Sequence, residues 1–135
     1  MTEMTAAQSR NLHVGIDIGS TTVKAVVLDA DTNEELFGVY RRHGSQQIQA
    51  TLRVLDEIVA RFPFAHIRCA LCGSGSEDIA RGIGAPFIQE VVAGATAVRA
   101  LYPQANCTIE LGGQDAKMIF FRHDESGVQE LGDMR

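Results

Sequence analysis

Residues 12–28 place a carboxylate and a glycine turn between two apolar runs. Asp17 lies near the end of the run Leu12–Ile18, and the second run is Val23–Leu28. A carboxylate at a strand end can hold Mg²⁺ through water, and Gly19 lacks a Cβ, so the chain can turn sharply and approach an anion closely. The amides and hydroxyls of the turn would line a concave anion site formed by Gly19, Ser20, Thr21 and Thr22. The pattern predicts a phosphate-binding hairpin, with an ordinary polar hairpin as the alternative.

Residues 108–121 repeat this layout. Glu110 lies in an apolar run, Gly112 and Gly113 form the turn, and a second apolar run follows Asp115. Two such hairpins in one chain are much rarer by chance than one. We predict that both turns lie at one edge of the same sheet and converge on a single Mg²⁺-nucleotide.

Alternating strand and helix patterns predict the elements that position these turns. After the first hairpin we expect a strand at Glu35–Arg41 and then a helix, capped by Ser45 and ended by Pro63, because apolar residues recur there at helical spacing. The later elements expected are strands at Ile67–Cys72, Cys107–Leu111 and Val128–Leu131, helices at Glu77–Gly82 and Glu90–Leu101, and an extended piece at Pro86–Gln89. This order predicts helices packed against a mixed sheet.

The composition limits the classes of function. With 135 residues, 45% hydrophobic residues and a formal charge of −5, the chain can form one compact domain and has no general attraction for nucleic acid or an anionic membrane. No apolar run approaches the ~18–20 residues that span a bilayer, and Met1–Asn11 lacks the apolar core of a signal peptide. We expect a cytoplasmic protein with a flexible tail at residues 1–11 and one domain at residues 12–135.

The two motifs GIDIGSTTVKAVVLD and ELGGQDAK resemble those of the superfamily that contains acetate and sugar kinases, Hsp70 and actin. Within it, they are most similar to the ATP-dependent activators of 2-hydroxyacyl-CoA dehydratases, including the larger fused CoA-enzyme activases. The resemblance covers residues 12–135. It implies an α/β fold, the RNase H-like lobe of the actin-like ATPase fold, with a mixed five-stranded sheet and helices packed against it.

The resemblance also implies catalytic roles. Asp17 would organise Mg²⁺ and its water, Gln114 would orient the attacking water, and Asp115 would assist the metal or the water. Glu110 is a departure, because the small activators usually carry Asp at this position, and the extra methylene weakens a metal role for it. These residues would act mainly by positioning and by neutralising charge, which is what phosphoryl transfer requires.

The implied cofactor is ATP or ADP with Mg²⁺. Ser20, Thr21 and Thr22 would contact the β- and γ-phosphates, and the second turn would approach the γ-phosphate. The full set of binding candidates is Gly19, Ser20, Thr21, Thr22, Lys24, Gly112 and Gly113. Lys24 has an equal alternative, because a lysine that alternates with apolar residues on a strand can simply face solvent.

A [4Fe–4S] cluster shared by two subunits is a further implication of the resemblance, and it makes the intact protein a homodimer. The cluster's cysteine would come soon after the second hairpin, about where this chain ends, so none of the cysteines here would ligate it. We expect this chain to be a fragment of a longer protein, without the second lobe that holds adenosine. By itself it would bind nucleotide weakly and turn over little or none.

The function expected of the intact protein is ATP hydrolysis that drives a low-potential electron into a partner 2-hydroxyacyl-CoA dehydratase or related CoA-dependent enzyme. Two positions depart from the activators: Gly94 replaces an expected histidine, and Cys72–Ser76 replaces a more aromatic and basic motif. A non-catalytic nucleotide-sensing or scaffold domain, or half of a sugar or acyl-group kinase, therefore remains an alternative. A metal-dependent nuclease is disfavoured by the acidic balance.

The remaining metal-ligating residue types favour structural roles. Cys69 and Cys72 match CxxC, but residues three apart on a strand point to opposite faces, which disfavours a shared metal or a disulfide. Cys107 would pack as a small apolar residue, and Glu90 opens a helix, where a carboxylate favours the positive dipole end. The histidines lack ligand spacing, and we interpret them as surface or turn residues: His13, His43, His66 and His123.

Overall fold

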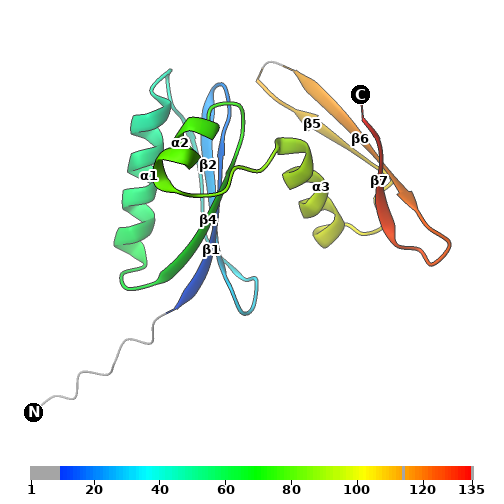
Figure 1. The fold of residues 1–135 in the computed structure, drawn as a ribbon, viewed down its shortest axis with the longest axis horizontal. Helices are drawn as coiled ribbons and strands as arrows, with labels where there is room; N and C mark the ends of the chain where they lie inside the picture. Colours follow the sequence, from blue (N-terminus) through cyan, green and yellow to red (C-terminus); the bar gives the residue numbers. More distant parts are fainter. Residues whose placement is uncertain (1–9, 114, 135) are drawn as a thin grey trace, which may run out of the picture.

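The computed structural model describes residues 10–113 and 115–134, which form two parts (Figure 1). The first part contains β1 (Asn11–Ile18), β2 (Thr22–Asp29), β3 (Glu35–Arg42), α1 (Gln47–Arg61), β4 (His66–Cys72) and α2 (Glu77–Ile83). The second contains α3 (Glu90–Leu101), β5 (Cys107–Leu111), β6 (Ala116–His123) and β7 (Gln129–Met134). None of the described helices is long and apolar enough to cross a membrane.

The first sheet is mixed, in the order β3-β2-β1-β4. β1 pairs antiparallel with β2 and parallel with β4. Beyond β4, Phe87 forms a single parallel bridge with Leu71, whose amide donates to Pro86 O at 3.0 Å and whose carbonyl accepts from the Ile88 amide at 2.8 Å. The fifth position of the predicted sheet is therefore occupied by one bridging residue, because the chain turns into α3 immediately afterwards.

Strict alternation of burial along β1 separates a buried face of the first sheet from a more accessible one. On β1, the side chains of Leu12, Val14, Ile16 and Ile18 are buried, while Asp17 is only half-buried. Helix α1 covers the apolar face with Val54 and Ile58, which are fully buried in the same cluster. Because successive strand residues point to opposite faces, packing α1 on one face leaves Asp17 on the other.

The second sheet, β5-β6-β7, is antiparallel and has its own small core. Ile119 and Phe121 of β6 pack against Ala95 of α3, with Val91 and Val98 beside them. The prediction that both hairpins lie at one edge of a single sheet is therefore wrong. Since α3 separates β5 from the first sheet, the second hairpin forms a second sheet with β7 and does not add a strand to the first sheet.

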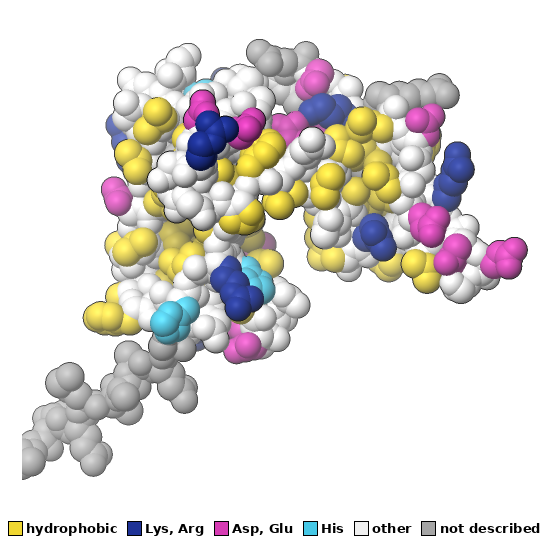
Figure 2. Space-filling view, viewed as in Figure 1, with side chains coloured by type: hydrophobic (Ala, Val, Ile, Leu, Met, Phe, Trp, Pro, Cys, Tyr) yellow, Lys and Arg dark blue, Asp and Glu magenta, His cyan; other side chains and the backbone are white. Residues whose placement is uncertain are grey.

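A hollow separates the two parts in the space-filling view, and charged side chains gather where the parts meet (Figure 2). An apolar pocket lies between them, lined by Val26 and Ala70 of the first sheet together with Ile88 and Ala93. The face of the first sheet opposite α1 is thus accessible along this pocket.

The start of α1 differs from the prediction. Its N-cap is Gln46, which makes no side-chain capping hydrogen bond, and Ser45 lies one residue earlier with φ +66°. Ser45 does not cap the helix, because its left-handed backbone belongs to the turn and its amide donates to His43 Nδ1 at 3.1 Å. The last strand also differs slightly, since β7 is Gln129–Met134 and not Val128–Leu131.

Two adjacent residues of α1 test how this helix packs. Ile58 is 1% exposed and Val59 is 59% exposed. We expect Ile58→Ala to lower the free energy of unfolding by about 2–5 kcal/mol, because it leaves a cavity against the sheet. Val59→Ala should change it by less than about 0.5 kcal/mol. Urea denaturation of both variants measures the difference, and equal losses would contradict the packing.

Candidate functional site

The turns of the two hairpins meet in space although they belong to different sheets. A Cβ added to Gly113 would lie 3.2 Å from Thr21 Oγ1 and 3.3 Å from Ser20 Oγ. A polar pocket lies between the turns and is lined by every predicted site residue that the structure describes: Asp17, Gly19, Ser20, Thr21, Thr22, Lys24, Glu110, Gly112, Gly113 and Asp115. Gln114 lies outside the described residues, and its role stays a prediction.

The first turn, formed by Gly19, Ser20 and Thr21, is closed by a hydrogen bond from the Gly19 amide to Thr22 O at 2.9 Å. The amides of Ser20 and Thr21 donate to no acceptor within residues 10–113 and 115–134. Free backbone amides in a concave turn are suited to bind an anion.

Asp17 and Lys24 are opposite each other on β1 and β2 and form an ion pair of 2.6 Å. Their side chains are 30% and 40% exposed. Partial burial lowers the pKa of Lys24, but the hydrogen bond and charge of Asp17 outweigh it, so the pKa is raised. Lys24 therefore stays charged and lies toward the pocket, not in the purely solvent-facing position of the alternative.

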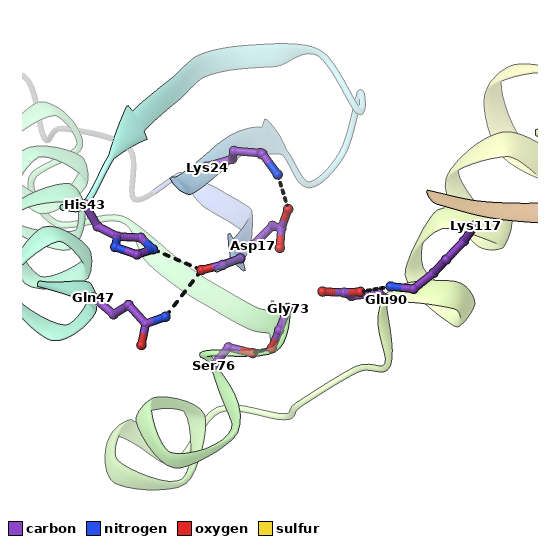
Figure 3. A network of polar contacts seen from close by, with 9 residues as sticks. Asp17, Lys24, His43, Gln47, Gly73, Ser76, Glu90 and Lys117 are labelled. Atoms are coloured by element: carbon purple, nitrogen blue, oxygen red, sulfur yellow. Dashed lines mark hydrogen bonds and ion pairs between the residues drawn. The ribbon is translucent and has the colours of Figure 1, made fainter. Parts of the chain in front are cut away.

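A second ion pair lies on the facing side, between Lys117 of β6 and Glu90 at the start of α3, at 2.6 Å (Figure 3). The hydrogen bond that Lys117 Nζ donates to Glu90 Oε2 raises the pKa of Lys117. The pairing of Lys117 with Glu90 was not predicted from the sequence, which indicated for Glu90 only a role at the start of a helix. A signal existed, because the acid-to-lysine spacing of Asp17 and Lys24 recurs in Glu110 and Lys117, which are also cross-strand partners.

The charge of the pocket constrains its ligand. Four carboxylates and two lysines line it, which leaves an excess of two negative charges. Within the described part of the chain, no three potential metal ligands are grouped closely enough to hold an ion by themselves. The donor set suits a hard cation such as Mg²⁺, which commonly binds through one or two carboxylates, water and phosphate oxygens. A phosphate ligand without a cation would be repelled.

His43 was interpreted as a surface or turn residue, but the structure buries it to 7% exposure against the first turn. Its Nε2 lies 3.0 Å from Gly19 O, and Gln47 Nε2 lies 3.4 Å from the same oxygen. These contacts join residues 24 and 28 positions apart, which no local pattern reveals.

The glycine turn after β4 packs against the end of β1, next to Asp17. Gly73 has φ +101°, and a Cβ there would collide with the Ile18 carbonyl and lie 2.5 Å from Asp17 Oδ1. The Gly75 amide donates to Ile18 O at 2.9 Å, while the buried Ser76 hydroxyl donates to Gly73 O at 2.8 Å. The segment that departs from the activator motif is therefore packed against the end of β1.

The cysteines do not form a cluster site within the described residues. Burial raises the pKa of Cys69, and burial together with the negative charges of Asp17 and Glu90 raises that of Cys72 to about 11. Both are poor ligands and poor nucleophiles near neutral pH, because the thiolate is the reactive form.

No protein-family model and no curated protein sequence matches the chain. Solved structures do match. Component A of the (R)-2-hydroxyglutaryl-CoA dehydratase of Acidaminococcus fermentans has a TM-score of 0.69 and 24% identity, over 91% of this chain and 46% of that one. The activator of the 2-hydroxyisocaproyl-CoA dehydratase of Clostridium difficile, with bound ADPNP, has a TM-score of 0.69 and 25% identity, over 92% and 45%. The ethanolamine utilization protein EutJ of Carboxydothermus hydrogenoformans has a TM-score of 0.60 and 20% identity, over 92% and 50%.

These similarities confirm the α/β, actin-like ATPase fold and the predicted resemblance to dehydratase activators. The chain spans about half the length of these structures.

Substitutions at two glycines test whether the turn after β4 packs against the end of β1 as described. We expect Gly73→Ala to lower the free energy of unfolding by about 1–3 kcal/mol, because alanine is strained at positive φ and its Cβ meets β1. Gly82→Ala in α2 is the control. A Cβ there meets nothing within 4 Å, and alanine favours the helix by about 0.5–1 kcal/mol. Urea denaturation measures both, and a neutral Gly73→Ala would contradict the packing described.

Thiol reactivity tests the cysteine assignment. With a pKa of about 11, roughly one Cys72 thiol in a thousand is ionised at pH 8. We expect iodoacetamide to modify the exposed Cys107 first, and Cys69 and Cys72 only after denaturation. Mass spectrometry of the timed reaction measures this order. Rapid modification of Cys72 in the folded chain would instead favour a reactive CxxC.

Proposed function

We propose that this chain is the phosphate-binding part of an ATPase. The observation that carries the proposal is the meeting of two glycine turns around a pocket that contains Asp17 and Lys24. In the first turn, the amides of Ser20 and Thr21 have no acceptor among the residues that the structure describes. One turn on each side suits an extended polyphosphate better than a single phosphate. ADPNP bound to the similar Clostridium difficile activator supports a nucleotide as the ligand.

Binding would exchange charge partners in the pocket. Mg²⁺ carried with the nucleotide would offset the excess negative charge and polarise the phosphate, with Asp17 as its water-bridged carboxylate. Lys24, now paired with Asp17 at 2.6 Å, would then be available to a phosphate oxygen. The amides of Ser20 and Thr21 would donate to the β- and γ-phosphates.

Hydrolysis would rely on the second turn. Gly112 and Gly113 leave room beside the γ-phosphate, since side chains at both positions would crowd their neighbours. We assign Gln114 the orientation of the attacking water and Asp115 a supporting role toward the metal or water. Glu110 would contribute charge, with Lys117 opposite it on β6.

The finer role follows from the similarity to activators. The intact protein would couple ATP hydrolysis to low-potential electron transfer into a 2-hydroxyacyl-CoA dehydratase or related CoA-dependent enzyme. A [4Fe–4S] cluster in a homodimer would supply the electron carrier, but Cys69, Cys72 and Cys107 do not fit as its ligands. We propose that residues 12–135 are the N-terminal part of such a protein and that a further lobe holds adenosine.

A nucleotide sensor without catalysis is the second candidate. The pairing of Asp17 with Lys24 and of Glu90 with Lys117 favours it, because both carboxylates are already neutralised by a neighbour. A sensor would bind Mg-ADP and Mg-ATP alike without releasing phosphate.

The Asp17→Asn variant tests the proposed function. We expect it to weaken Mg-ADPNP binding at least about tenfold, or about 1.4 kcal/mol, because the amide carries no charge for the hydrated cation. Asp56→Asn, on the exposed side of α1, should bind like the parent chain. Isothermal titration calorimetry with and without Mg²⁺ measures both.

Phosphate release by the full-length protein separates the two candidates. An ATPase should lose turnover in Asp17→Asn, whereas a sensor should show no turnover above that variant. Equal Mg-ADPNP affinity in the parent, Asp17→Asn and Asp56→Asn would contradict the site itself.

A further inference from the structure

We propose that His43 is a positioning residue of the phosphate site: as the neutral Nε2–H tautomer, it orients the Gly19–Ser20 peptide so that the Ser20 amide is presented to the ligand. The identity of the ligand rests on the proposed function. The orientation of the peptide is a separate matter, and it can be measured without any ligand.

The two ring nitrogens of His43 have partners that require one tautomer. Nε2 lies 3.0 Å from Gly19 O, which can only accept, so Nε2 carries the hydrogen. Nδ1 lies 3.1 Å from the Ser45 amide, which donates, so Nδ1 carries none. With 7% of its surface exposed, the ring is held in this state by both neighbours. A second ring proton would face the Ser45 amide and break that contact.

Pinning one carbonyl fixes the direction of the next amide. In a trans peptide the C=O and the following N–H point in opposite directions, and the described residues contain no cis peptide bond. With Gly19 O held by His43 and, at 3.4 Å, by Gln47, the Ser20 amide points away from both side chains. It donates to no acceptor within residues 10–113 and 115–134, and Ser20 lines the pocket.

The backbone of His43 holds the same turn at a second point. Its amide donates to Thr21 O at 3.1 Å. Figure 3 shows the His43 and Gln47 side chains directed at the Gly19 carbonyl. Both carbonyls, of Gly19 and Thr21, are thus bound from the β3–α1 side, while the amides of Ser20 and Thr21 have no acceptor among the described residues. A turn whose carbonyls are held on one side presents its donors on the other, which preorganises it for an anion.

Substitution of His43 distinguishes a space-filling role from the proposed hydrogen-bonding role. If His43 only filled space, leucine would replace it as well as any polar residue. If its Nε2–H matters, glutamine should restore function, because its amide nitrogen can reach the Gly19 carbonyl. His123 provides a matched control, since its Nε2 lies 3.1 Å from Pro103 O but it is exposed and remote from the pocket.

The experiment compares the parent chain with His43→Gln, His43→Leu and His123→Leu. Calorimetry with Mg-ADP should give an affinity within about threefold of the parent for His43→Gln and His123→Leu, and about tenfold weaker for His43→Leu. The thermal unfolding of each variant is measured as well, to show that it is folded at the temperature of the titration. A loss of affinity equal in both His43 variants, or no loss in His43→Leu, would overturn the role in binding.

Ligand-free NMR decides the orientation separately. In ¹³C,¹⁵N-labelled chains, the His43 ring should show a protonated Nε2, and His43→Leu should shift the Gly19 carbonyl and the Ser20 amide while His43→Gln largely restores them. Unchanged shifts in His43→Leu, or a protonated Nδ1 in the parent, would overturn the proposal. If the parent does not bind Mg-ADP, the proposed function fails, and the spectra still decide whether His43 orients the peptide.

Discussion

The candidate site depends on the close approach of two backbone turns. A Cβ at Gly113 would lie 3.2 Å from Thr21 Oγ1 and 3.3 Å from Ser20 Oγ, so a larger residue there would require these side chains of the first turn to shift. Because each hairpin belongs to a separate sheet with its own core, this contact joins two independently packed parts. A ligand that touches both turns would therefore strengthen the association of the parts as well as occupy the pocket.

Electrostatics determines which ligand suits the pocket. Each lysine is paired with a carboxylate at 2.6 Å, Lys24 with Asp17 and Lys117 with Glu90. The pairs stabilise the charged forms of both lysines, yet the carboxylates remain in excess. The pocket is consequently unsuited to a bare polyphosphate and suited to one that brings a divalent cation.

Hydrogen bonds on the side away from the pocket hold the backbone carbonyls of the first turn. His43, Gln47 and the turn after β4 bind the carbonyls of Gly19, Thr21 and Ile18, which leaves donors on the pocket side. These supports come from β3, α1 and the β4–α2 connection, so the precision of the turn depends on how the first sheet and its helices pack. Preorganised donors need no rearrangement when charge arrives, which is the physical advantage of building an anion site on a rigid scaffold.

Most of the helices and strands and both glycine turns could be predicted from the sequence, because strand alternation, helical spacing and glycine conformations are local properties. Three features follow only from the folded chain: the second hairpin forms its own sheet, His43 is buried against Gly19, and Glu90 binds Lys117. Those outcomes depend on contacts between residues 24 and 27 positions apart, or on which strand edge is free. No local pattern encodes them, because they arise only when separately formed elements compete to bury the same surfaces and satisfy the same polar groups.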